Sequence, residues 1–358
     1  MEQYHNLEVL LKERKVPLLS GEEDQMGSRE EKRKGWIHLL CSDEYGWLPP
    51  SPEKLTWEET VVKEDFLAGK APLKRVELTA VLETGIFTFP VYSVIPKKWD
   101  GRLVVLMNFR DHVPDEYLPS EEICDQGCGV LSFCYQDVTT DDGDFSNGLA
   151  GALHADRSQG NAPGKLMMWA WAAMRVLDYG LTIPGASADK TAVAGHSRLG
   201  KAALLAGGLD KRFACVYANE SGCSGAAVSR GKQGETVRAI CDKFPFWFCP
   251  AYRKYADRED ALPFDQHMLL ALTAPRRLYV GSAAEDLWAD PDSEYLGCAA
   301  ASPEWELYGE KGFVCEDRLP KAGDVFHGGK IGYHLREGRH YLSREDWIKF
   351  LDFFRTEP

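Results

Sequence analysis

The chain has 358 residues, of which 44% are hydrophobic and 27% charged, and its 42 basic and 55 acidic residues give a net charge of −13. This composition is typical of a globular protein with a large core. Because a negative net charge repels nucleic acid and anionic lipid surfaces, we expect no nucleic-acid partner and no membrane partner.

The sequence also bears on location and on its cysteines. No stretch approaches the ~18 uncharged apolar residues that cross a bilayer, and the opening MEQYHNLEVLLKERK lacks a secretory pattern. We therefore expect a cytoplasmic protein, or a secreted one if a leader was removed.

The ten cysteines are scattered, and the spacings Cys124/Cys128 and Cys241/Cys249 differ from those of zinc sites. We interpret the cysteines mostly as buried thiols and expect no metal.

The first 70 residues are charged and irregular, and three tryptophans, Trp36, Trp47 and Trp57, serve as anchors. We predict an N-terminal extension over 1–70 that packs on a catalytic domain over 71–358. That domain begins with RVELTAVLETGIFTFPVYSVIP, residues 75–96, which alternates apolar and polar residues around Thr84 and Gly85. This pattern predicts an antiparallel hairpin.

After the hairpin the pattern changes to continuous apolar runs separated by helical segments. Such runs predict strands covered on both faces, as in a parallel sheet with crossover helices. The predicted strands are 103–109, 129–135, 191–194, 213–219, 276–282 and 330–337, and KLMMWAWAAMRVLDYGL at 165–181 predicts a long apolar helix. The expected fold class is therefore α/β, with a mixed and mostly parallel sheet that begins with an antiparallel hairpin.

A final helix follows the last predicted strand. Ser343 and Asp346 form a capping-box pattern. Apolar residues then recur at helical spacing, at Trp347, Phe350, Leu351 and Phe354. This places His340 in the loop between the last strand and the last helix.

The stretch GHSRLGK, residues 195–201, follows the apolar run TAVA. Gly200 lies one position too late for the nucleophile elbow G-x-S-x-G, yet a strained strand-to-helix turn would still expose the Ser197 hydroxyl beside free helix N–H groups. Taken alone, the turn is equally compatible with an ordinary βα turn in a nucleotide-binding or structural unit.

The residues that follow other strands favour a nucleophile. Glu220 follows the strand at 213–219, Asp286 follows the strand at 276–282, and His340 follows the last strand. Functional groups gather at the carboxyl ends of parallel strands, and the chain order Ser, acid, His is that of α/β hydrolases. We interpret the remaining candidate histidines, His196, His267, His327 and His334, as structural.

These motifs resemble the glucuronoyl esterases, carbohydrate esterases that cleave the ester between glucuronic acid on xylan and lignin alcohols. The family's elbow reads G-C-S-R-x-G-K, and GHSRLGK matches it apart from His196. Three further segments resemble the family: NESGCSG at 219–225, LPFDQHMLLALTAPR at 262–276 and EDLWADP at 285–291. The resemblance covers about 75–355 and implies a bacterial-type member with the three-layer sandwich of the α/β hydrolases.

The resemblance implies roles for eight residues. Ser197 would be the nucleophile and His340 the general base, while either Glu220 or Asp286 would orient His340, with Glu220 favoured. Arg198 beside the nucleophile would stabilise the oxyanion. The glucuronate ring would be held by Lys201, Glu235 and Trp288. Fungal members carry a further glutamate before a Trp-Phe pair, which CDKFPFWF at 241–248 lacks.

The expected activity is that of a serine carboxylesterase without a cofactor. It would hydrolyse glucuronoyl or 4-O-methylglucuronoyl esters of alcohols through an acyl-enzyme. A glucuronate ester or a glucuronoxylan fragment would be the substrate, and we expect a monomer. Two alternatives remain, an acetylxylan esterase or other carbohydrate esterase, and a non-catalytic carbohydrate-binding relative.

Overall fold

The computed structural model describes residues 6–19 and 29–356. The strands form one mixed sheet with the order β1-β2-β3-β5-β4-β6-β7-β8-β10-β9. Their bounds are β1 Lys54–Asp65, β2 Ala71–Leu82, β3 Gly85–Val94, β4 Arg102–Asn108, β5 Cys128–Cys134, β6 Thr191–His196, β7 Cys215–Asn219, β8 Arg277–Ala283, β9 Val325–Phe326 and β10 Ile331–Arg336.

The helices lie between these strands and at the chain's two ends. The α-helices are α1 Leu7–Glu13, α2 Arg29–Leu40, α3 Phe66–Gly69, α4 Ser120–Asp125, α5 Tyr135–Val138, α6 Gly148–Ala152, α7 Lys165–Gly180, α8 Arg198–Leu209, α9 Val237–Lys243, α10 Gln266–Ala271, α11 Pro291–Ala301, α12 Pro303–Glu306 and α13 Arg344–Arg355. A π-helix, η1 Cys41–Tyr45, and 3-10 turns η2 Ala188–Lys190, η3 Pro245–Trp247, η4 Pro250–Tyr255 and η5 Glu259–Ala261 complete the set. Within the described ranges, no helix has the length and apolar character to span a membrane.

The sheet confirms the predicted antiparallel start and parallel continuation. Strands β2 and β3 form the expected hairpin, in which Leu82 pairs with Gly85. From β5 to β10 the neighbouring strands run parallel. The carboxyl ends of β6, β7, β8 and β10 therefore lie at the same edge of the sheet.

The N-terminal segment differs from the irregular extension expected for 1–70. Its residues 54–65 form β1, the edge strand, which pairs antiparallel with β2. Nearly every residue of β1 is exposed, so the strand lacks the apolar alternation that reveals a half-buried strand. That expectation was therefore wrong for β1, while residues 1–5 and 20–28 lie outside the described residues. The division of the chain at residue 70 stays a prediction.

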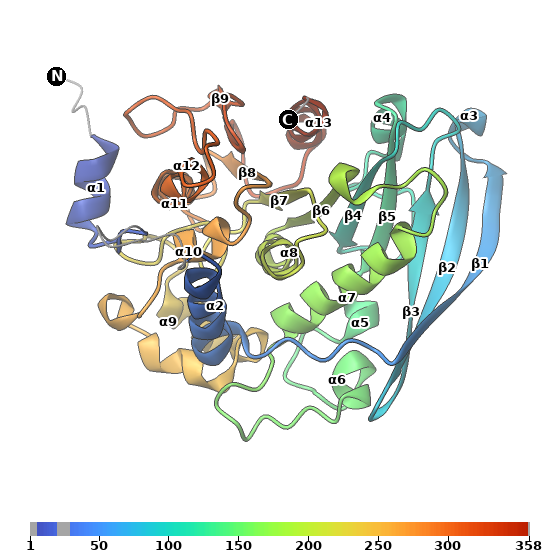
Figure 1. Cartoon of the computed structure of the whole chain (residues 1–358), viewed down its shortest axis with the longest axis horizontal. Coiled ribbons are helices and arrows are strands. Elements are labelled where there is room, and N and C mark those ends of the chain that lie inside the picture. The colour runs from blue at the N-terminus through green and yellow to red at the C-terminus, as the bar shows by residue number, and fades with distance from the viewer. Residues whose placement is uncertain (1–5, 20–28, 357–358) are drawn as a thin grey trace.

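Helices cover both faces of the sheet, as the predicted three-layer arrangement requires (Figure 1). Successive residues of β4 alternate between the layers. Val105 packs in the cluster that contains α7 and α8, whereas Val104 packs with Trp347 and Phe350 of α13. The capping box of Ser343 with Asp346 is present at the start of α13, which confirms the predicted final helix.

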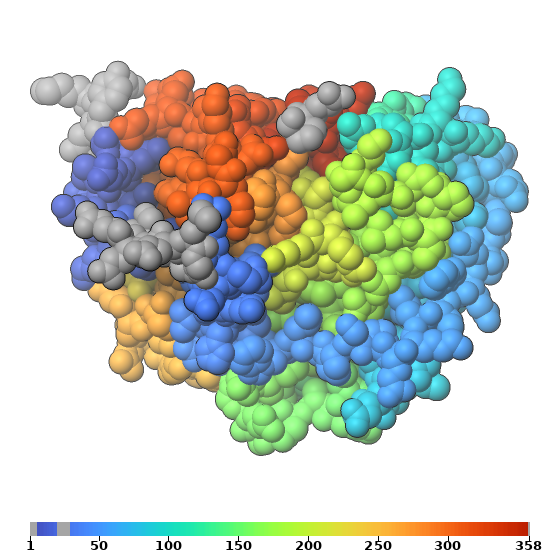
Figure 2. Space-filling model, viewed as in Figure 1, coloured from blue at the N-terminus to red at the C-terminus, as the bar shows by residue number. Residues whose placement is uncertain are grey.

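The segment between α2 and β1 crosses the outside of α7 and remains visible as a blue band on the surface (Figure 2). The indole of Trp171 in α7 donates to the carbonyl of Pro50, at 2.9 Å. In α2, the buried Arg33 donates to the carbonyls of Gly208 and Leu272, near the ends of α8 and α10. Hydrogen bonds with the core thus hold the N-terminal part of the chain in place.

The cysteines agree with the prediction of buried thiols. All ten are free thiols, nine of them are buried, and Cys315 is half-buried. Burial raises the pKa of Cys215 and Cys223 to about 12. Such thiols stay protonated at neutral pH and act as small apolar residues.

Gly207 allows α8 to approach β7, and this contact leads to a stability prediction. A Cβ at Gly207 would lie 2.0 Å from Val216 Cγ2, so Gly207→Ala should lower the free energy of unfolding by about 1–3 kcal/mol. Gly35 is the matched control, because a Cβ there would meet no described atom within 4 Å. Alanine at Gly35 in α2 should raise stability by about 0.5–1 kcal/mol. Urea unfolding measures both changes, and equal effects would contradict the packing argument.

Candidate active site

Ser197 stands on a strained turn between β6 and α8. Its backbone angles are φ 58° and ψ −127°, a region that non-glycine residues avoid at a cost of about 1–3 kcal/mol. Two glycines make the turn sterically accessible. A Cβ at Gly195 would lie 2.1 Å from the carbonyl oxygen of Leu199, and a Cβ at Gly200 would lie 3.0 Å from Ser221 Cβ. The Ser197 N–H donates to Asn219 O at 2.8 Å, which joins the turn to the end of β7.

His340 lies in the loop between β10 and α13, as predicted, and both candidate acids contact it. Its Nδ1 is 2.6 Å from Asp286 Oδ2 and 3.1 Å from Glu220 Oε2. Asp286 follows β8 and Glu220 follows β7, so three strand ends deliver the three side chains. The acid favoured from the sequence, Glu220, is the more distant of the two.

The two carboxylates control the charge of the imidazole. Burial on its own would lower the pKa of His340, but the hydrogen bonds and charges of Asp286 and Glu220 outweigh it and raise the pKa to about 9. Burial raises the pKa of Glu220 to about 8 against the opposing effects of His340 and Arg336. For Asp286, burial is outweighed by the His340 hydrogen bond, which holds its pKa below the usual value. The three groups titrate as a coupled set.

Arg336, the last residue of β10, holds the surroundings of His340. Its guanidinium donates to Glu220 Oε1 at 2.6 Å and to both oxygens of Asp346 at 2.9 and 3.0 Å. It also donates to the carbonyls of Glu337, Arg339 and Tyr341 in the loop that carries His340. Sequence reasoning did not identify Arg336, because an arginine at a strand end has many structural uses.

Arg198 is the first residue of α8 and lies beside the candidate nucleophile. Its Nη1 forms an ion pair with Asp141, and its guanidinium carbon lies 4.7 Å from the ring centroid of Trp247 and 5.4 Å from that of Phe244. Within the described residues, its Nε is buried without a hydrogen-bond partner. The guanidinium is therefore fixed on one side and retains unused N–H groups.

The three predicted sugar-binding residues form one hydrogen-bonded chain. Lys201 Nζ donates to Glu235 at 3.0 Å and to the carbonyls of Ser221 and Cys223, both at 2.6 Å. Trp288 Nε1 donates to the other oxygen of Glu235 at 3.2 Å. All three ammonium hydrogens of Lys201 thus have protein acceptors, so its main effect is to hold the 220–235 loop. Trp288 is 51% exposed and presents an apolar ring to solvent.

A single cavity of about 190 Å³ joins these groups. It is lined by seven of the eight residues selected from the sequence, namely Ser197, Arg198, Lys201, Glu220, Glu235, Trp288 and His340. The eighth, Asp286, lies behind this lining and contacts His340. The sequence missed a further part of the lining, where Phe244 and Trp247 stack with ring centroids 3.8 Å apart beside Lys243. The aromatic run FPFWF was the available signal for that part of the lining.

His196 packs beneath the catalytic candidates rather than opening into the cavity. Its ring centroid is 4.5 Å from that of His340, its Nδ1 is 2.7 Å from Asn219 Oδ1, and burial lowers its pKa to about 3. Ligand atoms of His196, Glu220 and His340 all lie within 4.8 Å of one another, a spacing that a metal ion could use. The Arg336 guanidinium on Glu220 opposes a cation there, so the cluster fits a hydrogen-bonded imidazole better than a metal.

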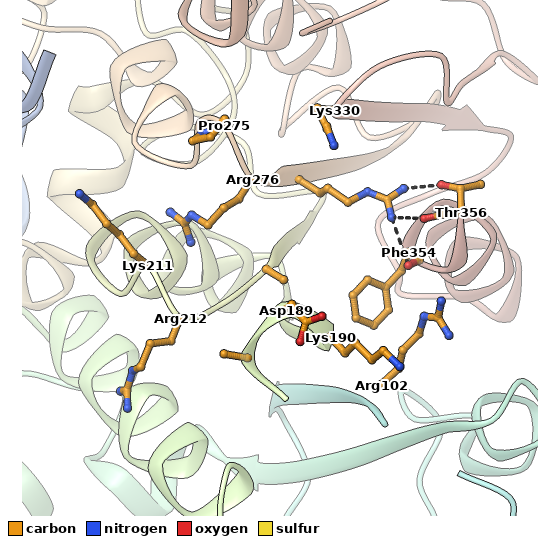
Figure 3. Close-up of a pocket in the computed structure, with 13 residues that line it drawn as sticks. Arg102, Asp189, Lys190, Lys211, Arg212, Pro275, Arg276, Lys330, Phe354 and Thr356 are labelled. Carbon is orange, nitrogen blue, oxygen red and sulfur yellow. Dashed lines mark hydrogen bonds between the residues drawn. The ribbon is translucent and has the colours of Figure 1, made fainter. Parts of the chain in front are cut away.

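A larger cavity, of about 680 Å³, lies at the other edge of the sheet, where β4, β6 and β8 begin (Figure 3). Its lining is rich in lysine and arginine, and two of the arginines bind carbonyls at helix ends. Arg276 donates to Gly207 O at 2.7 Å and Leu272 O at 3.1 Å. Arg277 donates to Phe354 O at 3.2 Å and to Thr356 O at 2.7 Å. Cations at helix C-termini stabilise the fold, so these two arginines have a structural role.

The chain is similar to several known proteins. The model of the family described as "Glucuronyl esterase, fungi" matches residues 87–309. Carbohydrate esterase MZ0003, from an unknown prokaryotic organism, is 40% identical over 238 residues, 65% of this chain and 54% of that protein. The 4-O-methyl-glucuronoyl methylesterase 1 of Sodiomyces alcalophilus is 33% identical over 192 residues, 51% of this chain and 38% of that protein. The chain thus spans about half, or less, of the length of these curated relatives.

A solved structure extends the similarity over nearly the whole chain. The glucuronoyl esterase from Solibacter usitatus is 31% identical, with a TM-score of 0.84 over 95% of this chain and 98% of that one. This likeness confirms the fold class predicted from the sequence.

The contact between His340 and Asp286 leads to a pH prediction. Asp286→Asn should lower the pKa of His340 from about 9 towards its usual value of 6.5, because one of two stabilising charges is removed. Charged His340 therefore contributes fully to the free energy of unfolding below pH 6.5, and this contribution is lost as the pH rises through 9. NMR titration of the imidazole measures the pKa. Glu285→Gln, at an exposed neighbouring acid, is the control, and equal pKa values in wild type and Asp286→Asn would contradict the prediction.

Proposed function

The chain belongs to the glucuronyl esterase family, whose model matches more than half of it, and we propose that it is a serine carboxylesterase for glucuronoyl or 4-O-methylglucuronoyl esters. One observation carries the proposal. Ser197, on a strained turn, and His340, held by two carboxylates, open into the same cavity. The name of the Sodiomyces alcalophilus relative supports the substrate class.

In the proposed reaction, Ser197 attacks the ester carbonyl at C6 of the uronate. In its neutral form, which predominates above about pH 9, His340 donates its Nδ1–H to Asp286 and Glu220, so Nε2 is free to accept the Ser197 proton. The alcohol leaves with that proton, and an acyl-enzyme remains. Water then attacks the acyl-enzyme, again with His340 as the base, and releases the uronic acid.

Two groups are proposed to stabilise the tetrahedral oxyanion. Ser197 is the N-cap of α8, so the positive end of this helix lies at the Ser197 turn, and Arg198 supplies a guanidinium beside it. Loss of one such donor typically reduces the rate about 10²- to 10³-fold. The charge that develops on the carbonyl oxygen is therefore balanced by groups already in place.

The walls of the cavity are proposed to select the sugar. Trp288 offers an exposed ring to one face of the pyranose, and the rings of Phe244 and Trp247 also line the cavity. Glu235 accepts from Lys201 and Trp288 and can accept from a hydroxyl that replaces either donor. Monomeric state, cytoplasmic location and independence of any cofactor stay predictions.

The first functional test compares wild type with Ser197→Ala on benzyl glucuronate. The substitution should reduce kcat/KM by about 10⁴- to 10⁶-fold, because the hydroxyl is the proposed nucleophile. Ser187→Ala, at an exposed hydroxyl, should retain wild-type activity. Release of benzyl alcohol measures the rate, and an active Ser197→Ala variant would refute the mechanism.

The same assay with acetylated xylan separates the alternatives. Release of acetate faster than release of benzyl alcohol would favour an acetylxylan esterase. Binding of xylan fragments without a burst on any activated ester would indicate a non-catalytic carbohydrate-binding protein.

The two acids lead to a separate prediction. Because each contacts His340 Nδ1, Asp286→Asn and Glu220→Gln should each lower kcat by only about 10- to 100-fold, while the double variant should lose about 10⁴-fold. Asp286→Asn should have the larger single effect, since its contact is shorter. Steady-state kinetics measures kcat, and a single variant as inactive as the double variant would assign orientation to one acid alone.

A further inference from the structure

Asp141, in the loop between α5 and α6, is outside the set selected from the sequence, yet it reaches the active site. We infer that Asp141 is a positioning residue that fixes the Arg198 guanidinium for the oxyanion before the substrate binds. This inference rests on the proposed function and adds a residue that positions Arg198.

Three donors converge on the carboxylate of Asp141. Its Oδ2 accepts from Arg198 Nη1 and from the hydroxyl of Tyr135, the latter at 3.0 Å. Its Oδ1 accepts from the indole Nε1 of Trp247 at 2.6 Å. The side chains of Asp141 and Arg198 are 11% and 25% exposed, so water screens this pair less than a surface pair. A group that only neutralised Arg198 would need no contact with Trp247.

The contact with Trp247 places a flat surface against Arg198. The guanidinium carbon lies 4.7 Å from the indole centroid, and the ring of Phe244 is parallel to that indole within 3°. Cation–π contact restricts the guanidinium to the face of the ring, while the carboxylate sets its rotation. Together they determine which N–H groups of Arg198 remain for the cavity.

The loop that carries Asp141 is itself braced. Lys165 at the start of α7 is fully buried and donates to Thr139 Oγ1 at 2.7 Å and to the carbonyl of Asp144 at 2.5 Å. These contacts lie on both sides of Asp141. Asn147 Oδ1 also accepts from the Thr140 N–H at 3.1 Å. The carboxylate is thus held by a rigid loop, as a preorganised site requires.

An arginine side chain has many rotamers, and its freedom must be lost before it can serve one geometry. In this site the loss occurs on folding, because Asp141 and Trp247 hold the guanidinium in the absence of substrate. Without Asp141, the transition state itself would have to order Arg198. The effect should therefore appear in kcat far more than in KM.

A double-mutant cycle with benzyl glucuronate tests the inference. Asp141→Asn keeps the side chain's size and should lower kcat about 10- to 100-fold with KM within about twofold. Arg198→Ala should lower kcat about 10²- to 10³-fold. In the Arg198→Ala background, Asp141→Asn should cost less than about threefold, because its effect passes through Arg198. Asp142→Asn, at the exposed neighbour, should match wild type.

Far-UV circular dichroism and the melting temperature show whether each variant is folded. If Asp141→Asn does not fold, Tyr135→Phe is the milder variant, because it removes one donor from Asp141 Oδ2 and leaves Arg198 in place. The smaller loss of kcat in Tyr135→Phe should also disappear in the Arg198→Ala background.

The outcomes separate the two proposals. An active wild type in which the Asp141 and Arg198 effects multiply, or in which Asp141→Asn has wild-type kcat, would overturn this inference and leave the esterase proposal intact. A wild type without activity on any uronate ester would remove the proposed function and this inference with it.

Discussion

The active site depends above all on the buried guanidinium of Arg336. It lies between two buried carboxylates, Glu220 and Asp346, and it binds three carbonyls of the loop that carries His340. Removal of Arg336 would take a counter-charge from two buried acids, which is far more costly than loss of a surface pair. The same contacts set the path of the chain from β10 into α13. One side chain therefore couples the last helix to the position of the imidazole.

Two strand ends beside this network carry backbone strain. Ser197 and Glu220 both have positive φ angles, 58° and 46°, and each follows a strand in the centre of the sheet. The N–H of Ser197 is held by Asn219 O, and the N–H of Glu220 is held by Gly281 O at 2.7 Å. Neighbouring strands thus impose the two conformations, as expected for strain that persists at functional positions.

The sequence predicted the elements that carry a strong period. The apolar helix α7, the hairpin β2–β3 and the capped helix α13 all followed from spacing and turn residues, because burial of one or both faces leaves a clear pattern. Strand β1 had no such signal. Both of its faces are exposed, and its pairing with β2 depends on backbone hydrogen bonds that any sequence can make. An exposed edge strand is therefore difficult to distinguish from a charged extension.

The site was predictable where a functional group follows directly from a strand end. Ser197, Glu220, Asp286 and His340 each lie just beyond a strand, and parallel strands deliver such residues to one edge. Residues that position these groups carry no comparable mark. Asp141 reaches Arg198 across 57 positions, and Arg336 reaches Glu220 across 116, so only the folded chain reveals the pairs. The residues that react can thus be predicted from their local sequence context, whereas the residues that orient them are identified only from the tertiary structure.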